Sequence, residues 1–359
     1  MLFKKNIFKN KKVLITGHTG FKGSWLTAIF LKLNAKVIGI SIDQKKHSHF
    51  NYLKLQKRIK HYNADICNYK KIEKIINSNR PDFIFHLAAQ SLVKRSIENP
   101  IFTWKTNVIG TINIIEIVRK IENIKKNKCI LVIITSDKCY KNLEKKSGYK
   151  ENDILGGDDP YSASKASAEI AINSEINSFV KPSSSTRIAS ARAGNVIGGG
   201  DWSENRIIPD IFRSIKLKRK LLIRNPRSTR PWQHVLEPLC GYIKLAYALK
   251  NDKKFHGEPF NFGPSKFSNK TVLNLVKEIS SDFANFKWKI LKRKKTFKET
   301  GILRLNSSKA KKYLKWQTKL SFKETMRLTS EWYRSFFNEG KKIKTFEQIE
   351  NYLKKYIYR

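Results

Sequence analysis

The chain has 359 residues, of which 40% are hydrophobic and 28% are charged. This length and composition suit one large α/β domain or two domains sharing an interface, and they exclude a disordered chain. No apolar run reaches the roughly 18 to 20 residues that span a bilayer, and the N-terminus lacks the pattern of a secretory signal. We therefore expect a cytoplasmic protein that does not bind a membrane.

The formal charge of +44 raises the question of a nucleic-acid partner. The lysines are scattered over the chain, however, and no nucleic-acid-binding module accompanies them. We expect weak, salt-dependent attraction to polyanions but no specific nucleic acid as partner. There is no C-x-x-C pair and no Cys/His group with zinc spacing, so we expect no metal and reduced thiols at Cys67, Cys129, Cys139 and Cys240.

A strand, a glycine-rich turn, a helix and a second strand open the chain. Residues 11–17 and 35–43 are short apolar runs typical of strands. Between them a helix is predicted, with one apolar face formed by Trp25, Leu26, Ile29, Phe30 and Leu33. A βαβ unit of about 30 residues implies parallel strands joined by a right-handed crossover.

Strands and helices keep alternating downstream. Further strands are predicted at 81–89, 129–136 and 186–198, with helices between them, one of which covers 161–179. The strands are apolar throughout instead of alternating, so both faces of their sheet should be buried. The sequence therefore predicts an α/β fold with a doubly wound parallel sheet of the Rossmann type.

The glycine-rich turn has the spacing G-x-x-G-x-x-G. Glycines there permit a tight turn and close approach of the backbone to a pyrophosphate, and the following helix N-terminus offers N–H groups to phosphates. Because the turn sits in the first βα connection, we predict a dinucleotide site formed by Gly17, Gly20, Phe21, Lys22 and Gly23.

Asp43 ends the second predicted strand, about 20 residues beyond the last of these glycines. A carboxylate there can accept hydrogen bonds from a ribose diol and would repel a 2′-phosphate, which favours NAD over NADP. Lys45 and Lys46 follow closely and weaken this preference, and Asp43 could instead be an acid of a surface loop.

After Gly198 the sequence becomes rich in loops, Arg, Trp and Pro. We predict a nucleotide-binding Rossmann domain over 1–198 and a smaller, mostly C-terminal α/β substrate-binding region over 199–359. The two parts should be interleaved in the sequence, because the strand-like residues 258–264 could return to the main sheet. We therefore expect about 232–264 to belong to the main domain.

Two groups of polar residues are candidates for chemistry. Tyr161 and Lys165 lie four residues apart on a predicted helix, so the ammonium sits near the phenol and favours its ionised form. Ser136, Asp137 and Lys138 stand in a row where a buried strand ends, at the sheet edge where ligands bind. The alternative for this trio is a polar cluster that caps a turn.

The motifs together resemble the extended short-chain dehydrogenase/reductase family over nearly the whole chain. The resemblance rests on the glycine spacing, Asp65-Ile66, the run from His86 to Ala89, Asn107 in TNVIGT, and Tyr161-Ser-Ala-Ser-Lys165. Within the family, the strings GHTGFKGSWL, TSDKCY, GNVIGGGDWSENRIIPD and STRPWQHVLEPLCGY are most similar to the CDP-glucose 4,6-dehydratases.

The resemblance implies further site residues. Asp65 and Ile66 would flank the adenine of NAD, and Asn107 would support the active site. The cofactor would also be bound by Leu87, Ala88, Ala89, Asn107, Tyr161 and Lys165. The substrate, a nucleotide sugar, would be held by Gln90, Asn195, Arg206, Arg224 and Arg230, since arginine forks suit phosphate oxygens, with surface charge as the alternative for each arginine.

The implied reaction is dehydration of CDP-D-glucose to CDP-4-dehydro-6-deoxy-D-glucose by a hydro-lyase with tightly bound NAD, in the synthesis of deoxysugars and of lipopolysaccharide O-antigen.

The resemblance also implies a role for each catalytic residue. Tyr161 would take the proton of the sugar 4-hydroxyl while NAD takes hydride, and Ser136 would bind the 4-oxygen. Lys138 would then remove the C5 proton and Asp137 would protonate the leaving 6-hydroxyl. An Asp–Lys pair stabilises both charged forms, which opposes these roles; one hypothesis is that elimination starts only after substrate and cofactor have desolvated the site. The family also implies a homodimer.

Other functions fit the same residues less well. A dTDP-, GDP- or UDP-sugar dehydratase differs only in the nucleotide, and a 4-epimerase needs no acid–base pair for elimination. A non-catalytic NAD-binding or polyanion-binding protein would not need Tyr161, Lys165, Asp137 and Lys138 together.

Overall fold

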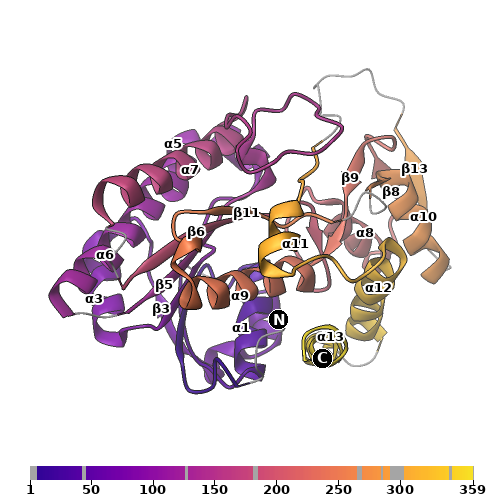
Figure 1. The fold of residues 1–359 in the computed structure, drawn as a ribbon. Helices are drawn as coiled ribbons and strands as arrows, with labels where there is room; N and C mark the ends of the chain where they lie inside the picture. The colour runs from indigo at the N-terminus through magenta and orange to yellow at the C-terminus, as the bar shows by residue number, and fades with distance from the viewer. Residues whose placement is uncertain are drawn as a thin grey trace.

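The computed structural model describes residues 6–42, 46–125, 128–180, 185–264, 269–283, 286–291, 303–338 and 342–358. A sheet of seven parallel strands forms its centre (Figure 1). In spatial order the strands are β11 (Pro259–Asn261), β6 (Arg187–Arg192), β5 (Ile130–Ile134), β4 (Phe83–His86), β1 (Lys12–Thr16), β2 (Lys36–Ser41) and β3 (Lys60–Asn63). The predicted doubly wound α/β fold is confirmed.

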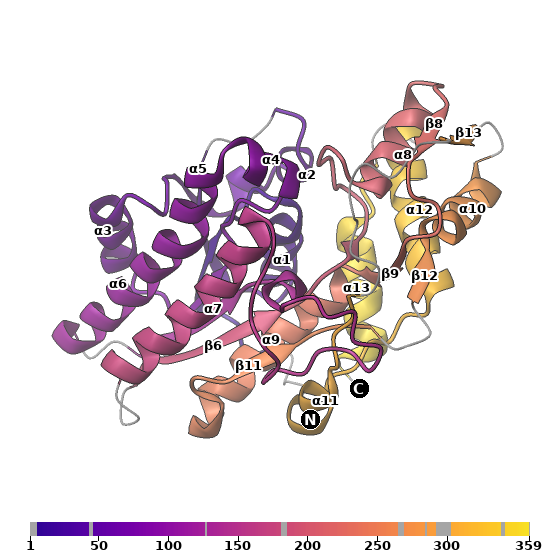
Figure 2. The same ribbon diagram turned by 90° about the horizontal axis from the view of Figure 1, so that it is seen from above.

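Helices cover both faces of the sheet (Figure 2). Because side chains alternate along a strand, Leu14 of β1 packs toward one face while Val13 and Ile15 pack toward the other. The face of Leu14 is covered by α3 (Tyr69–Asn79), α6 (Gly110–Lys125) and α7 (Pro160–Phe179). The opposite face is covered by α1 (Phe21–Lys32) and α9 (Leu236–Asn251). The five apolar residues predicted for the first helix are all buried.

The edge strand β3 was not predicted from the sequence. Its residues are Lys-His-Tyr-Asn, none of which is fully buried. An edge strand has one paired side and needs little apolar content, so hydrophobic periodicity does not reveal it.

The smaller region lies beyond the carboxyl ends of the strands, on the side of the molecule away from α3 and α6 (Figure 2). It contains the two-stranded sheets β9–β12 and β8–β13 and packs through α8 (Ile207–Lys216), α10 (Val272–Asp282), α12 (Phe322–Asn338) and α13 (Thr345–Tyr356). The strands are β8 (Leu221–Ile223), β9 (Thr229–Pro231), β12 (Asn269–Thr271) and β13 (Trp288–Ile290). β11, which falls within the strand-like residues 258–264, pairs with β6 in the main sheet. The division of the chain into two domains stays a prediction.

Short elements complete the chain around the strand ends. The helices are α2 (His49–Tyr52), α4 (Val93–Glu98), α5 (Pro100–Trp104), α11 (Ser308–Leu314) and a π-helical turn at Lys105–Ile109. Single turns of 3-10 helix cover Leu55–Arg58, Asp137–Cys139 and Lys253–Phe255, and a small parallel pair joins β7 (Val196–Ile197) to β10 (Gln233–His234). No helix in the described part of the chain is long and apolar enough to cross a membrane.

β1 lies at the point where the order of the sheet reverses. The chain runs from β1 outward through β2 to β3, then returns to β4 on the other side of β1 and continues through β5 and β6. In open α/β sheets ligands bind at the carboxyl ends of the strands beside such a reversal. The turns after β1, β4 and β5 are therefore the expected place for a site.

Four buried histidines predict loss of stability in acid. Burial lowers the pKa of each from 6.5 to about 3. Between these values the unfolded chain binds protons that the folded chain does not, so stability present above pH 6.5 falls as the pH drops toward about 3. The slope is about 1.4 kcal/mol per pH unit for each histidine. The four are His18, His49, His86 and His234.

Urea unfolding at several pH values between 7 and 5 measures this slope. His86→Gln should make it shallower by about one proton. His47 has an exposed ring, and His47→Gln serves as the control. Equal slopes for wild type and His86→Gln would show that His86 does not contribute.

Candidate active site

The glycine turn is closely packed against the segment that follows β4. Gly17 has φ +70°, and a Cβ built on it would lie 2.8 Å from Ala88 Cα. A Cβ on Gly23 would lie 2.1 Å from the carbonyl oxygen of Gly17. Helix α1 begins after Gly20, with no side chain capping its N-terminus. The free N–H groups there suit a pyrophosphate, and Phe21 and Lys22 form the first residues of the helix.

Gly23→Ala tests how far this turn depends on its shape. Because the added methyl group would meet backbone and not a flexible side chain, the turn must shift, at about 1–3 kcal/mol. We expect a lower thermal midpoint and much weaker binding of NAD, followed by calorimetric titration. Gly156→Ala is the control, since its Cβ would lie 3.3 Å from a lysine side chain. Unchanged NAD affinity in Gly23→Ala would contradict the role of the turn.

The residues predicted to flank the adenine follow β3. Asp65 Oδ1 accepts a hydrogen bond of 2.9 Å from the N–H of Cys67. Ile66 is buried, and its carbonyl oxygen accepts a hydrogen bond of 3.0 Å from the Asn113 side chain. Asp43 lies outside the described residues. Contacts of these three residues with a cofactor stay predictions.

The segment after β4 lies across the end of β1. The N–H groups of Leu87 and Ala88 donate to the carbonyl and hydroxyl oxygens of Thr16, at 3.1 Å in both cases. Ala89 continues this segment, which the close approach of Gly17 to Ala88 brings against the glycine turn. The predicted cofactor-lining residues and the glycines therefore form one continuous backbone surface.

Asn107 joins this segment to the helix that carries Tyr161. It is 1% exposed, lies in the π-helical turn, and donates to the carbonyl oxygen of Gln90 at 3.0 Å and to Ser164 at 2.9 Å. Its Oδ1 accepts from the N–H of Gln90 at 2.8 Å. The side chain of Gln90 itself bonds Thr103 and Leu92. The role of Gln90 in binding the substrate stays a prediction. To bond the substrate, its side chain would have to give up one of its bonds to Thr103 or Leu92.

Tyr161 and Lys165 lie one turn apart on the buried face of α7. Burial lowers the pKa of Lys165 to about 8. Burial also raises the pKa of Tyr161 to about 12, helped by Asp137, while a hydrogen bond with Ser136 and the charge of Arg206 act in the opposite direction. The phenol therefore lies near both Ser136 and Asp137, as the proposed chemistry requires.

Asp137 and Lys138 lie in a single 3-10 turn shortly after β5, and the Ser136 hydroxyl caps this turn by accepting a hydrogen bond of 3.2 Å from the N–H of Lys138. Ser136 donates to Asp137 Oδ1 at 2.9 Å, and Asn195 donates to Asp137 Oδ2 at 3.2 Å, so both oxygens of this buried carboxylate are held. Asn195 has φ +52°. Gly194 passes so close that a Cβ on it would overlap the carboxylate. Lys138 is half-buried beside this group.

A buried tyrosine that sequence reasoning did not identify completes the site. Tyr242 of α9 is fully buried, and Lys22 donates to its hydroxyl at 3.5 Å. Burial raises its pKa, with further contributions from Asp137 and Tyr161, which places its hydroxyl near both. The only signal in the sequence is one hydroxyl on an otherwise apolar helix face.

The predicted phosphate-binding arginines differ in position. Arg206 stands just before α8 and pairs with Asp201 at 3.3 Å. The pKa of Lys22 is lowered to about 8, chiefly by burial, and the charges of Arg206 and Lys165 lower it further. Arg206 therefore lies at the site.

The other two arginines lie in the smaller region. Arg230 lies in β9, where it bonds the carbonyl oxygen of Thr229, and Arg224 is exposed just after β8. Substrate contacts of these three arginines stay predictions.

Fold and site together define a class: an α/β protein with a glycine turn of the dinucleotide-binding type and a Tyr–Lys pair whose phenol lies near the strand-end Asp137. Residues 14–329 match the family model described as GDP-mannose 4,6 dehydratase. The chain is 40% identical over 355 residues to a CDP-glucose 4,6-dehydratase of Salmonella typhimurium, covering 97% of this chain and 98% of that protein. The chain therefore belongs to the GDP-mannose 4,6 dehydratase family, and the predicted resemblance is confirmed.

Solved structures share the fold. An epimerase of Methanothermobacter thermautotrophicus matches with TM-score 0.77 and 22% identity, over 97% of this chain and 96% of that one. A dTDP-glucose 4,6-dehydratase of Bacillus anthracis in complex with NAD matches with TM-score 0.74 and 24% identity, over 92% and 98%.

Proposed function

We propose that this protein dehydrates CDP-D-glucose to CDP-4-dehydro-6-deoxy-D-glucose, with NAD held tightly throughout. The observation that carries the proposal is the match along almost the entire length of the Salmonella typhimurium CDP-glucose 4,6-dehydratase. The Asp137–Lys138 pair beside Tyr161 supports it, because an epimerase has no need of an acid and a base for elimination. The product would enter synthesis of deoxysugars and of lipopolysaccharide O-antigen.

The residues present fit NAD. The backbone at Gly17 and Gly23 leaves no room for a Cβ, as the tight turn and close helix packing of a dinucleotide-binding βα connection require. The uncapped N-terminus of α1 supplies N–H donors, and Lys165 would bond the nicotinamide ribose. When bound, NAD would accept hydride from sugar C4 and return it to C6.

Tyr161 would take the proton of the sugar 4-hydroxyl. The Lys165 ammonium one turn away favours the phenolate that this step needs, and Ser136 would bind the 4-oxygen. The 4-ketone that results acidifies the proton on C5. Lys138 would remove that proton and Asp137 would protonate the departing 6-hydroxyl, so that water is lost. Ser136 and Asn195 orient the Asp137 carboxylate for this purpose.

A panel of nucleotide sugars tests the proposal. The purified protein is incubated with CDP-, dTDP-, GDP- and UDP-glucose and with GDP-mannose, and products are examined by mass spectrometry for loss of water and by proton NMR for epimers of unchanged mass. We expect loss of one water from CDP-glucose and much slower reaction with the others. A different preferred nucleotide would correct the substrate, whereas an epimer without loss of water would overturn the reaction.

We also propose a cytoplasmic homodimer. The cysteines are thiols and not disulfides, which suits a reducing compartment.

Exposed apolar side chains support the dimer. Large ones are exposed on neighbouring helices α4, α5 and α7, and such patches mark interfaces. They are Ile97, Ile101, Trp104, Ile170 and Phe179. Light scattering should give twice the chain mass for wild type and a lower mass for Ile101→Lys; a monomeric wild type would overturn the dimer.

A further inference from the structure

A buried ion pair contacts both ends of the segment that carries the strand-end trio. Glu169 of α7 and Arg192 at the end of β6 are joined at 2.8 Å, and their side chains are 3% and 4% exposed. Removing two charges from water is costly, and an apolar pair of the same volume is often as stable. The pair is therefore poorly explained as a source of stability alone.

Glu169 binds the residue that precedes the strand-end trio. The hydroxyl of Thr135 donates to Glu169 Oε1, and Ser190 donates to Oε2 at 2.9 Å. Thr135 is joined covalently to Ser136, so this carboxylate fixes where the polar segment begins. Glu169 also continues the buried face of α7 that carries Tyr161 and Lys165.

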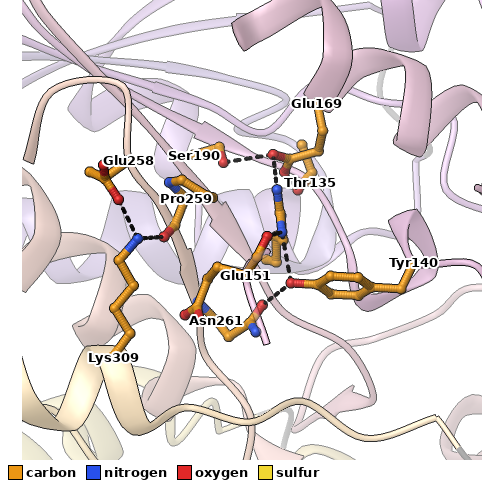
Figure 3. A network of polar contacts seen from close by, with 10 residues as sticks. Thr135, Tyr140, Glu151, Glu169, Ser190, Glu258, Pro259, Asn261 and Lys309 are labelled. Atoms are coloured by element: carbon orange, nitrogen blue, oxygen red, sulfur yellow. Dashed lines mark hydrogen bonds and ion pairs between the residues drawn. The ribbon is translucent and has the colours of Figure 1, made fainter. Parts of the chain in front are cut away.

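Arg192 binds the residue at the other end of the same segment. One Nη donates to the Tyr140 hydroxyl at 2.7 Å, and the guanidinium lies 5.0 Å from the centre of the Tyr140 ring. The same nitrogen donates to the carbonyl oxygen of Glu151 at 2.8 Å. The Tyr140 hydroxyl in turn donates to Asn261 of β11 at 2.9 Å, as Figure 3 shows. Tyr140 immediately follows the turn that contains Asp137 and Lys138.

We propose that the Glu169–Arg192 pair is a clamp that positions Asp137 and Lys138 for elimination by binding Thr135 and Tyr140, the residues on either side of their turn. The same acid supports the charge of Lys165. The residues of the clamp are positioning residues: they touch neither substrate nor cofactor and act through the segment between them. The inference rests on the proposed dehydratase function.

The charge of Lys165 depends on groups from several elements. Burial lowers its pKa to about 8, while Glu169 on its own helix and Cys139 in the strand-end turn raise it. His86 of β4 and Lys22 of α1 also lie close enough to interact with its charge. Loss of the Glu169 charge should therefore lower the pKa of Lys165 further, and the first step should lose rate at a lower pH than in wild type.

Tyr140→Phe is the mildest test of the clamp. It keeps the ring and removes the hydroxyl that joins Arg192 to Asn261. With CDP-glucose, rapid-mixing absorbance should show reduced nicotinamide forming at nearly the normal rate. Its disappearance, which follows elimination, should slow by about 10- to 100-fold, as small misplacements of reacting groups do. Equal slowing of both steps, or of neither, would overturn the proposal.

A double substitution separates positioning from stability. Glu169→Gln alone leaves Arg192 buried without its partner and should lower the thermal midpoint. Glu169→Gln with Arg192→Met removes both charges, so the midpoint should recover. Turnover should not recover, and the alkaline limb of the pH profile of the first step should stay displaced to lower pH. A double variant with wild-type midpoint, turnover and pH profile would show that the pair is merely structural.

Glu258→Gln is the matched control. Glu258 pairs with Lys309 beside β11, in the same view of Figure 3, without contacting the clamp. This variant should keep wild-type turnover and pH profile. Failure of the wild-type protein to dehydrate any sugar of the panel would reject the proposed function, whereas a reactive wild type with unaffected clamp variants would reject the clamp alone.

Discussion

Replacing Tyr161 with phenylalanine should stop the reaction before any nicotinamide is reduced. The phenol is the group proposed to accept the 4-hydroxyl proton, and the hydrogen bond with Ser136 and the charge of Arg206 lower its pKa against the effect of burial. Phenylalanine fills the same buried space but cannot accept a proton. Loss of a positioned general base costs about 10²- to 10⁴-fold in rate. Rapid mixing of the NAD-loaded variant with CDP-glucose, followed by nicotinamide absorbance, measures this step.

The control for Tyr161→Phe is a buried tyrosine whose hydroxyl bonds Glu237 and not one of the predicted catalytic residues. Tyr352 of α13 donates to the Glu237 carboxylate at 2.9 Å, and Tyr352→Phe should cost about 1 kcal/mol of stability with turnover unchanged. Tyr161→Phe should still bind NAD through the glycine turn. A Tyr161→Phe protein that still reduces its nicotinamide on adding substrate would remove the phenol from this role.

Replacing Lys138 with alanine should separate the two halves of the reaction. The first half depends on Tyr161 and Lys165, so reduced nicotinamide should form normally. Without the base, the C5 proton stays in place and the reaction should halt there, with turnover lower by about 10²- to 10⁴-fold. Persistent nicotinamide absorbance and the absence of C5 exchange in deuterated water would be the observations. Asp137→Asn should also leave the nicotinamide reduced, through loss of the acid, but Lys138 could still exchange the C5 proton with deuterated water.

Lys141→Ala provides the comparison for Lys138→Ala, because Lys141 is exposed three residues further along the same segment. It should behave as wild type. Full turnover in Lys138→Ala would make its assignment as base wrong. Equal loss of nicotinamide reduction would instead move Lys138 into the first step.

Local sequence was sufficient wherever neighbours in the chain are neighbours in space. The turn from Gly17 to Gly23 and the Tyr161–Lys165 pair are such cases, since a βα turn and a helical i, i+4 spacing bring their members together without help from the rest of the fold. The apolar face of α1 was predicted for the same reason. The polar edge strand β3 was not, because it carries no hydrophobic pattern.

The sequence by itself determined the parallel sheet, the dinucleotide turn and the types of residue available for chemistry. Only the tertiary structure decided which distant residues surround them. Asn195 bonds Asp137, which lies 58 residues earlier in the sequence. Tyr242 and Lys22, which are 220 residues apart, are hydrogen-bonded, as are Arg192 and Tyr140, which are 52 residues apart. The physical reason is that buried polar groups must find partners, and which partners lie within reach depends on how the strands are ordered and where their ends meet.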